Sequence, residues 1–206
     1  MSTRPLRLTL VSDGSSDRAL LPMIRWLLRR AGVDTPIEDS WADLGRLRNP
    51  PKTLADKITR SIELFPCDLL FVHRDAEGEP AEKRLDEIQA GLPAGQRCIP
   101  VIPVRMLEAW LLFDEGLIRM ASGNPHGKAA LPLPVFDKLE SLPDPKTVLI
   151  SLLKTASGLN GRRLARFNVY EARSRVAVLA DDFTQLLRLN AFRLLADSIT
   201  AEIRRG

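Results

Sequence analysis

The sequence predicts an α/β fold in which helices flank a parallel β-sheet. Short runs of aliphatic and β-branched residues recur along the first half of the chain, as is typical of strands buried on both faces. Between them lie segments whose apolar residues repeat at spacings of three and four, as in amphipathic helices. This alternation predicts a Rossmann-like sheet. The expected strands are residues 6–12, 37–41, 68–73 and 99–104, and the expected helices are residues 17–31, 53–65 and 81–92.

Composition changes near Ser122. With 206 residues and a hydrophobic content of 45%, the chain can bury a full core. Glycine and proline are frequent just beyond Ser122, which predicts a long loop, and the rest of the chain has helical patterns at 146–157, 169–179 and 192–204. We therefore predict an α/β domain of residues 1–122 and a helical C-terminal extension or lid of residues 123–206.

The chain has the features of a cytoplasmic protein. Cys67 and Cys98 are far apart in sequence and fit no zinc-binding spacing, so both are expected to be reduced. No apolar stretch approaches the roughly 18 residues of a membrane span. The amino terminus lacks the pattern of a signal peptide. We expect a cytoplasmic location and no membrane partner.

The balance of charge makes nucleic acid a candidate partner. The net charge is +4 with an isoelectric point near 9.4, and arginine predominates over lysine. Guanidinium groups suit bidentate contacts with phosphates. Five arginines cluster in the extension and by default form a solvated face, of which the first three are candidate phosphate-binding residues: Arg162, Arg163, Arg166, Arg173 and Arg175.

Acidic residues follow three of the apolar runs. Asp13 comes after the first, Asp75 and Glu77 after the third, and Glu108 after the last. Since parallel strands end at one edge of a sheet, where ligands bind, these carboxylates should converge. Such a cluster needs a cation, and oxygen ligands suit Mg²⁺ or Mn²⁺. The sequence thus indicates metal-dependent phosphate chemistry, with Arg74, Arg105 and Lys128 as candidate phosphate-binding residues.

Each of these residues also has a purely structural interpretation. Asp13 could cap a helix, Glu77 could be solvated, and His73 could be a satisfied half-buried histidine rather than a metal ligand. Glu108 could stabilise the first turn of a helix. Asp75 could be the partner of a buried arginine, either Arg74 or Arg105. The three tryptophans are most simply core or interface residues: Trp26, Trp41 and Trp110.

Three familiar motifs are excluded by single residues. The segment His73-Arg74-Asp75 is not a kinase catalytic loop, because Pro80 stands where asparagine is required. Gly123 to Lys128 is not a phosphate loop, because Ala129 replaces the required hydroxyl residue. Asp17 replaces the last glycine of a nucleophile elbow, which argues against serine hydrolysis.

The remaining pattern resembles the Toprim domain of topoisomerases, primases and related nucleases. That family has an acid and a glycine after its first strand and Asp-x-Asp-x-x-Gly after a later one. Here these positions hold Asp13-Gly14 and His73-Arg74-Asp75-Ala76-Glu77-Gly78. Two positions depart from the pattern, since Asp13 replaces glutamate and His73 replaces the first aspartate. The segments 100–112 and 121–125 are similar to an uncharacterised bacterial Toprim-like family.

The resemblance implies a nuclease, in a gene often found beside an AAA-type ATPase in defence loci. In that scheme Asp75 and Glu108 hold Mg²⁺ or Mn²⁺, Asp13 acts as general base or second ligand, and His73 or Glu77 completes the shell. The preferred hypothesis is therefore metal-dependent hydrolysis of DNA or RNA. The alternative is a catalytically degenerate Toprim-like binding module that serves an ATPase as a partner subunit.

Overall fold

A parallel sheet organises the first half of the chain. In the computed structural model, which describes residues 4–205, the strand order is β2-β1-β3-β4. Val11 lies beside Val72 and His73 beside Val101, so β1, β3 and β4 all end at one edge of the sheet. The predicted Rossmann-like α/β class is confirmed. The strands are β1 (Leu6–Val11), β2 (Ile37–Trp41), β3 (Leu69–His73) and β4 (Cys98–Val101).

The last strand is shorter than the sequence pattern predicts. We expected residues 99–104, but β4 ends at Val101. Pro103 has no N–H with which to extend a ladder. Beyond β4 the carbonyl oxygens of residues 103–105 instead accept hydrogen bonds from the backbone of residues 76–78. The chain after β4 thereby supports the loop that follows β3.

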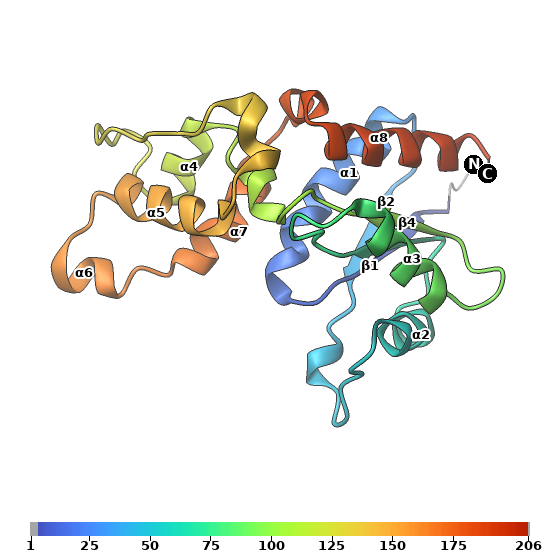
Figure 1. Cartoon of the computed structure of the whole chain (residues 1–206). Coiled ribbons are helices and arrows are strands. Elements are labelled where there is room, and N and C mark those ends of the chain that lie inside the picture. The colour runs from blue at the N-terminus through green and yellow to red at the C-terminus, as the bar shows by residue number, and fades with distance from the viewer. Residues whose placement is uncertain (1–3, 206) are drawn as a thin grey trace.

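Helices cover both faces of the sheet (Figure 1). Alternate strand residues supply the two faces: Leu8, Leu10 and Phe71 belong to one hydrophobic cluster, whereas Val11 and Val72 belong to another. The 3-10 turn η1 (Ser15–Ala19) and helix α1 (Leu20–Arg30) pack in the first cluster. Helices α2 (Leu54–Leu64) and α3 (Ala81–Gly91) cover the second.

The rest of the chain leaves the sheet and returns to it (Figure 1). We call residues 114–182 the arm, and the helix that follows it, α8 (Asn190–Ile203), lies back against α1 and β4. The predicted helix 169–179 is present as α7 with those bounds, whereas α4 and α6 were not predicted. The elements from β4 to α8 are η3 (Leu107–Leu111), α4 (Glu115–Ala121), η4 (Phe136–Ser141), α5 (Pro145–Ser157), α6 (Gly161–Ala165), α7 (Val169–Leu179) and η5 (Thr184–Arg188).

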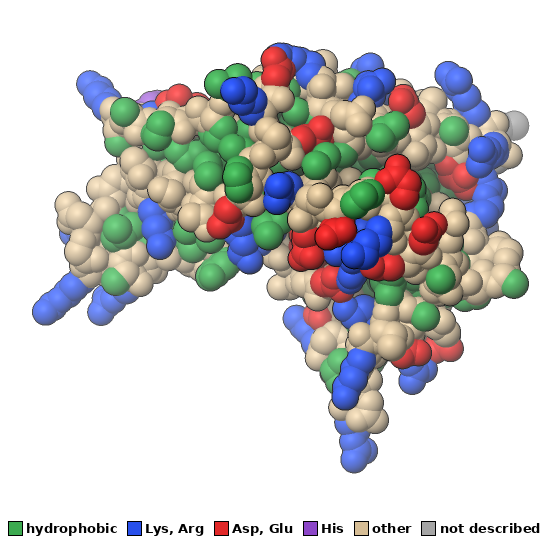
Figure 2. Space-filling model, in the orientation of Figure 1, with side chains coloured by type: hydrophobic (Ala, Val, Ile, Leu, Met, Phe, Trp, Pro, Cys, Tyr) green, Lys and Arg blue, Asp and Glu red, His purple; other side chains and the backbone are tan. Residues whose placement is uncertain are grey.

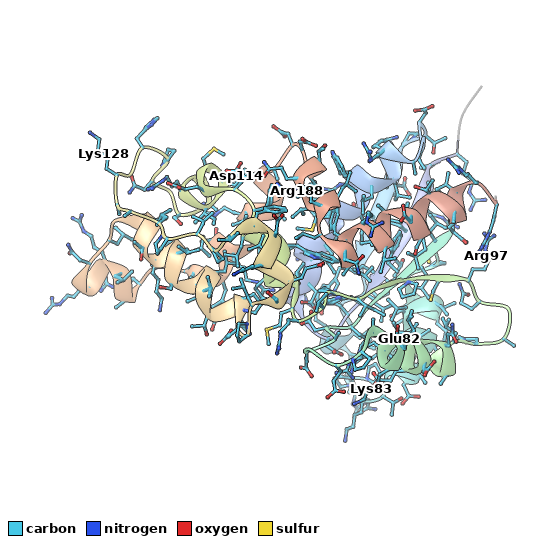
Figure 3. The ribbon with its side chains drawn as sticks, turned by 45° about the horizontal axis from the view of Figure 1, so that its top comes forward. Glu82, Lys83, Arg97, Asp114, Lys128 and Arg188 are labelled. Carbon is cyan, nitrogen blue, oxygen red and sulfur yellow. The ribbon has the colours of Figure 1, made fainter. Side chains whose placement is uncertain are left out.

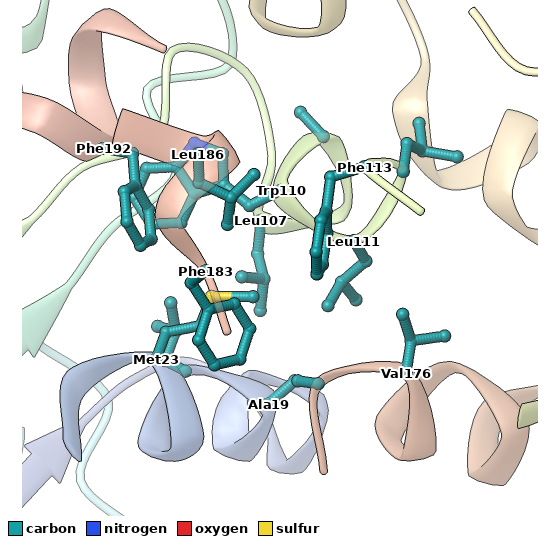
Figure 4. Close-up of a cluster of buried hydrophobic side chains, with 14 of the residues drawn as sticks. Ala19, Met23, Leu107, Trp110, Leu111, Phe113, Val176, Phe183, Leu186 and Phe192 are labelled. Atoms are coloured by element: carbon teal, nitrogen blue, oxygen red, sulfur yellow. The ribbon is translucent and has the colours of Figure 1, made fainter. Parts of the chain in front are cut away.

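One hydrophobic cluster joins the arm to the sheet (Figure 4). Trp110 packs edge-on against Phe192 with ring centroids 5.1 Å apart, and Phe113 meets Phe183 at 5.8 Å. Val176 of α7 is buried in the same cluster as Ala19 of η1. The hydrophobic core thus includes residues from both sides of residue 122. The domain boundary expected there stays a prediction.

Neither cysteine is in a disulfide. Cys67 and Cys98 are both free and partly buried. Burial raises the pKa of the Cys98 thiol to about 11, so it stays protonated near neutral pH. Among the helices of residues 4–205, none is both long enough and apolar enough to span a bilayer.

Candidate active site

The loop after β3 holds Asp75 at the carboxyl edge of the sheet. Ala76, Glu77 and Gly78 donate backbone hydrogen bonds of 3.0 Å to the carbonyls of Pro103, Arg105 and Val104. The Asp75 carboxylate then turns toward η3, where its Oδ1 accepts a hydrogen bond of 3.0 Å from the Leu107 N–H. Loop and carboxylate are therefore fixed against the segment that carries Glu108.

This loop requires glycine at position 78. Gly78 has a φ of +85°, and Glu77 beside it also has a positive φ, of 57°. A Cβ at Gly78 would lie 2.9 Å from the guanidinium of Arg105. Gly78 thus meets a conformational demand, and the guanidinium at the flexible end of Arg105 packs against the backbone of the loop.

Asp75 has an unfavourable environment for a carboxylate. Burial, and next the nearby charges of Glu108 and Asp17, raise the pKa of Asp75 from 3.8 to about 6, although His73 and the Leu107 N–H oppose the rise. The ionised group therefore lacks full compensation from its neighbours. A bound cation would supply that compensation.

His73, the last residue of β3, contacts the Asp75 carboxylate. The ring is 3% exposed and its Nδ1 lies 3.0 Å from the carbonyl oxygen of Val101. Since a carbonyl only accepts, Nδ1 carries a proton and donates it there. Nε2 then faces Oδ1 of Asp75 at 3.4 Å, where a proton on either group makes the contact favourable.

Asp13 lies between two cations. Its Oδ1 accepts a hydrogen bond of 2.7 Å from Lys57 Nζ, and its Oδ2 one of 2.7 Å from Arg74. Burial raises the pKa of Asp13, but the Lys57 hydrogen bond and the charges of Arg74 and Lys57 outweigh it, so the pKa lies below 3.8. Asp13 is thus ionised at neutral pH and holds both cations at the sheet edge.

Charge pairs continue from Arg74 around the end of β3. Arg74 also approaches Glu87 of α3 at 3.4 Å, and Arg84 reaches the same Glu87 at 2.7 Å. Arg84 is mostly buried, donates to the backbone carbonyl of Asp75 at 3.0 Å and pairs with Glu77 at 3.2 Å. The arginine partner proposed for the Asp75 side chain, Arg74 or Arg105, was wrong: Arg74 contacts Asp13 and Glu87 instead.

Glu108 is buried with an arginine of the arm. Oε1 of Glu108 lies 3.2 Å from Arg173, and the two side chains are 5% and 4% exposed. The Nε of Arg173 has no hydrogen-bond partner among the described residues. From its position in the sequence, we expected Arg173 to belong to a solvated arginine face. It is buried instead.

The other candidate cations lie elsewhere. Lys128 is exposed in the loop after α4, at the end of the arm remote from α3, where Glu82 and Lys83 are labelled (Figure 3). Arg162, Arg163 and Arg166 are exposed on and just after α6. The structure thus brings Arg74 to the acidic edge and leaves the other four on the arm.

Three residues of this site were missed in the sequence. Asp17 was treated only as part of a capping turn, and its Oδ2 does accept the Gly14 N–H at 3.1 Å. Its charge nevertheless acts on Asp75. Lys57 and Arg84 belong to the helices α2 and α3. In the sequence each is simply a basic residue among the polar residues of a helix, and this pattern is too common to indicate a site.

The carboxylates do not form a closed metal cage. Among the described residues, no three His, Cys, Asp or Glu side chains are placed to hold one metal ion together. Mg²⁺, however, is usually held by one or two carboxylates with water and substrate phosphates rather than by a cage of protein ligands. The undercompensated carboxylate of Asp75, with Glu108 and Asp17 nearby, fits that mode of binding.

Two cavities adjoin this edge. One of about 400 Å³ is lined by Asp13, Lys57 and residues 42–45 and 50–51, and the other, of about 640 Å³, lies between η1, β2 and α7. Figure 2 shows a broad hollow between the arm and the projecting segment that contains η2 (Leu44–Arg46); α7 of the arm lines the larger cavity and η2 lines the smaller one. Basic side chains are visible at the ends of both projections (Figure 2).

Comparison of the chain with protein families, with characterised proteins and with solved structures gives no match.

Proposed function

We propose that the carboxyl edge of the sheet is a Mg²⁺-dependent site for hydrolysis of nucleic-acid phosphodiesters. The single observation that carries this proposal is the Asp75 carboxylate just after β3, held by the Leu107 N–H at 3.0 Å with His73 at 3.4 Å, in a setting whose burial raises its pKa to about 6. Carboxylates whose pKa is strongly perturbed by burial and by neighbouring charges are typical of functional sites. The resemblance of residues 73–78 to the Toprim motif supports the same assignment.

The ion would be held by Asp75, with Glu108 and Asp17 as the nearest further carboxylates. Mg²⁺ is favoured over Mn²⁺ because the His73 Nδ1 is already hydrogen-bonded to a carbonyl and Nε2 is directed at Asp75. When bound, such an ion polarises a phosphoryl oxygen and acidifies water.

The protein's own residues orient the acid and attract the phosphate. His73 and the Leu107 N–H hold the Asp75 carboxylate in one orientation. Lys57 and Arg74 present positive charge after β1, at the same edge of the sheet, and Asp13 keeps both in place. With a lowered pKa, Asp13 is a weak base, so its role is to position these cations rather than to accept a proton.

A cleavage assay tests the proposal. We expect labelled DNA or RNA to be cut with Mg²⁺ and not with EDTA, and Asp75→Asn to lower the rate by at least about 100-fold. Asp86→Asn is the matched control, since Asp86 is an exposed acid of α3. Equal rates for Asp75→Asn and the parent chain would overturn the assignment.

A second candidate function is a non-catalytic partner subunit of an AAA-type ATPase. It is favoured by a specific observation: two of the three predicted acids already have cationic partners, Asp13 with Lys57 and Arg74, and Glu108 with Arg173. In that case nucleic acid is bound without cleavage at any Mg²⁺ concentration. Co-purification with an ATPase encoded beside the gene then becomes the deciding measurement.

A further inference from the structure

The larger cavity contains two aromatic side chains that the site above does not use. It has a volume of about 640 Å³ and is lined by η1, the start of α1, the end of β2 and the arm helix α7. That volume is within the range of roughly 300–1,000 Å³ found for small-molecule sites. Trp41 and Tyr170 both line it.

Trp41 is held as a fixed platform. Its Nε1–H donates to Ser12 Oγ at 2.9 Å, which orients the indole at the end of β2. The guanidinium of Arg18 lies 5.9 Å from the centre of the ring. Arg18 is exposed and makes no ion pair with any other described residue, so a ligand can displace it or stack with it.

Tyr170 has no packing role that explains its position. It is the only tyrosine of the chain and lies in the first turn of α7 with 64% of its surface exposed. An exposed ring at the mouth of a cavity offers a flat apolar surface and a hydroxyl. Aromatic rings of this kind stack on unpaired bases regardless of their sequence.

The charges of the cavity favour an uncharged occupant. The lining holds two basic and two acidic side chains, Arg18, Arg25, Asp39 and Glu171, so its formal charge is zero, and Arg25 is paired with Asp39. A phosphate would therefore gain little here, whereas a neutral planar group would gain stacking. The phosphates of the same ligand require cations outside this cavity.

One such cation, Lys57, is next to it and is shared with the Asp13 carboxylate. Ser15 and Trp41 line both the larger cavity and the 400 Å³ cavity that contains Asp13 and Lys57. A ligand with its flat group beside Trp41 can thus extend toward Lys57 at the acidic edge. Alternating flat neutral groups and anions are the chemistry of a nucleic-acid strand.

We propose that the cavity between Trp41 and Tyr170 binds an unpaired nucleobase of a single-stranded nucleic acid, whose backbone runs toward Lys57 and Asp75. Bases of a duplex are stacked on one another and cannot enter it. The inference rests on the proposed function, because it names the substrate class of that site, but it concerns binding and not cleavage.

Binding without metal tests it separately from catalysis. In EDTA, we expect a fluorescent oligothymidylate of about 12 nucleotides to bind more tightly than a duplex of equal length, as judged by anisotropy. Tyr170→Ala should weaken binding by about 5- to 100-fold, the effect of losing one stacked base. Tyr170→Phe should bind like the parent chain, and so should Val135→Ala, which removes an equally exposed apolar side chain elsewhere.

Three results would overturn the inference: no binding by the parent chain, parental affinity in Tyr170→Ala, or equal affinity for thymidine monophosphate and the oligonucleotide. The last result would mean that the cavity takes a free nucleotide and not a strand. Tyr170-dependent binding without any cleavage in Mg²⁺ would instead refute only the nuclease proposal. Cleavage that does not depend on Tyr170 would refute only this inference.

Discussion

Glu108 and Arg173 form an ion pair that is almost wholly removed from solvent, with Oε1 and the guanidinium 3.2 Å apart. Glu108 belongs to the turn after β4 and Arg173 to the arm helix α7, so the pair joins the acidic edge of the sheet to the arm. Burial of two charges is costly unless they remain paired. The position of the arm therefore determines how the charge of Glu108 is compensated.

Breaking this pair should destabilise the fold strongly. We expect Arg173→Met to cost about 3–5 kcal/mol in urea denaturation, because it leaves the Glu108 carboxylate buried without its partner. The double variant Glu108→Gln with Arg173→Met should recover most of that loss. If the single and the double variant were equally unstable, the charge of Glu108 would not be the cause.

Asp75 should make the fold less stable above about pH 6. Its folded-state pKa of about 6 exceeds the usual 3.8, so the folded protein binds this proton more tightly than the unfolded chain does. The penalty is complete above pH 6 and disappears as the pH falls toward 4. Asp75→Asn should therefore be more stable than the parent chain at pH 8, by about 1–3 kcal/mol, and should match it near pH 4.

Thermal melts of both proteins from pH 4 to 8 without metal measure this difference. The amide oxygen of asparagine can still accept the Leu107 N–H, so loss of that hydrogen bond does not confuse the comparison. A constant difference across this pH range would contradict the assignment of the titration to Asp75.

Gly78→Ala should displace the loop that carries Asp75. Both Gly78 and Gly32 have positive φ, 85° and 94°, but only at Gly78 does an added Cβ meet a neighbour, the Arg105 guanidinium. Gly32→Ala should cost about 1 kcal/mol from backbone strain alone. Gly78→Ala should cost about the same, because the flexible Arg105 guanidinium can turn aside, and should lower Mg²⁺-dependent cleavage, whereas the control leaves it unchanged. Parental cleavage in Gly78→Ala would mean that the conformation of this loop does not position Asp75.

The exposed arginines of α6 should add to affinity for nucleic acid in a salt-dependent way. If Arg162, Arg163 and Arg166 each contact a phosphate, replacing all three by alanine should reduce the slope of log K against log salt by about two to three. Sequence preference should stay the same, because phosphate contacts do not read bases. The control replaces three exposed arginines at α8, namely Arg193, Arg204 and Arg205. A parental slope in the α6 variant would exclude this surface.

The sheet was predictable because its signal is local. The run that became β3 is apolar at every position but its last, as is typical of a strand buried on both faces, and the run that became β1 is apolar at four of its six positions. The short helix α4 escaped notice, although Asp114 caps it by accepting the Leu117 N–H at 2.9 Å, which is a signal readable from sequence.

The charge pairs were not predictable because they join distant segments. Arg173 lies only two residues from the exposed Arg175, and nothing local distinguishes them. The side of α7 that faces η3 decides that Arg173 is buried while Arg175 is solvated. Lys57 likewise meets Asp13 across 44 residues. Sequence alone therefore located the acids but not their partners.

The packing of Phe113 against Phe183 limits how far the arm can move. These rings lie where the chain leaves for the arm and where it comes back, and both are buried in the cluster shared with the sheet. A body anchored at two adjacent points and through a common core has little freedom to swing. The hollow beside the arm therefore keeps its width, and a ligand that enters it must adopt a conformation that fits. Duplex DNA has a persistence length of about 50 nm and would bend little to fit the hollow, whereas a flexible single strand could change its conformation to fit.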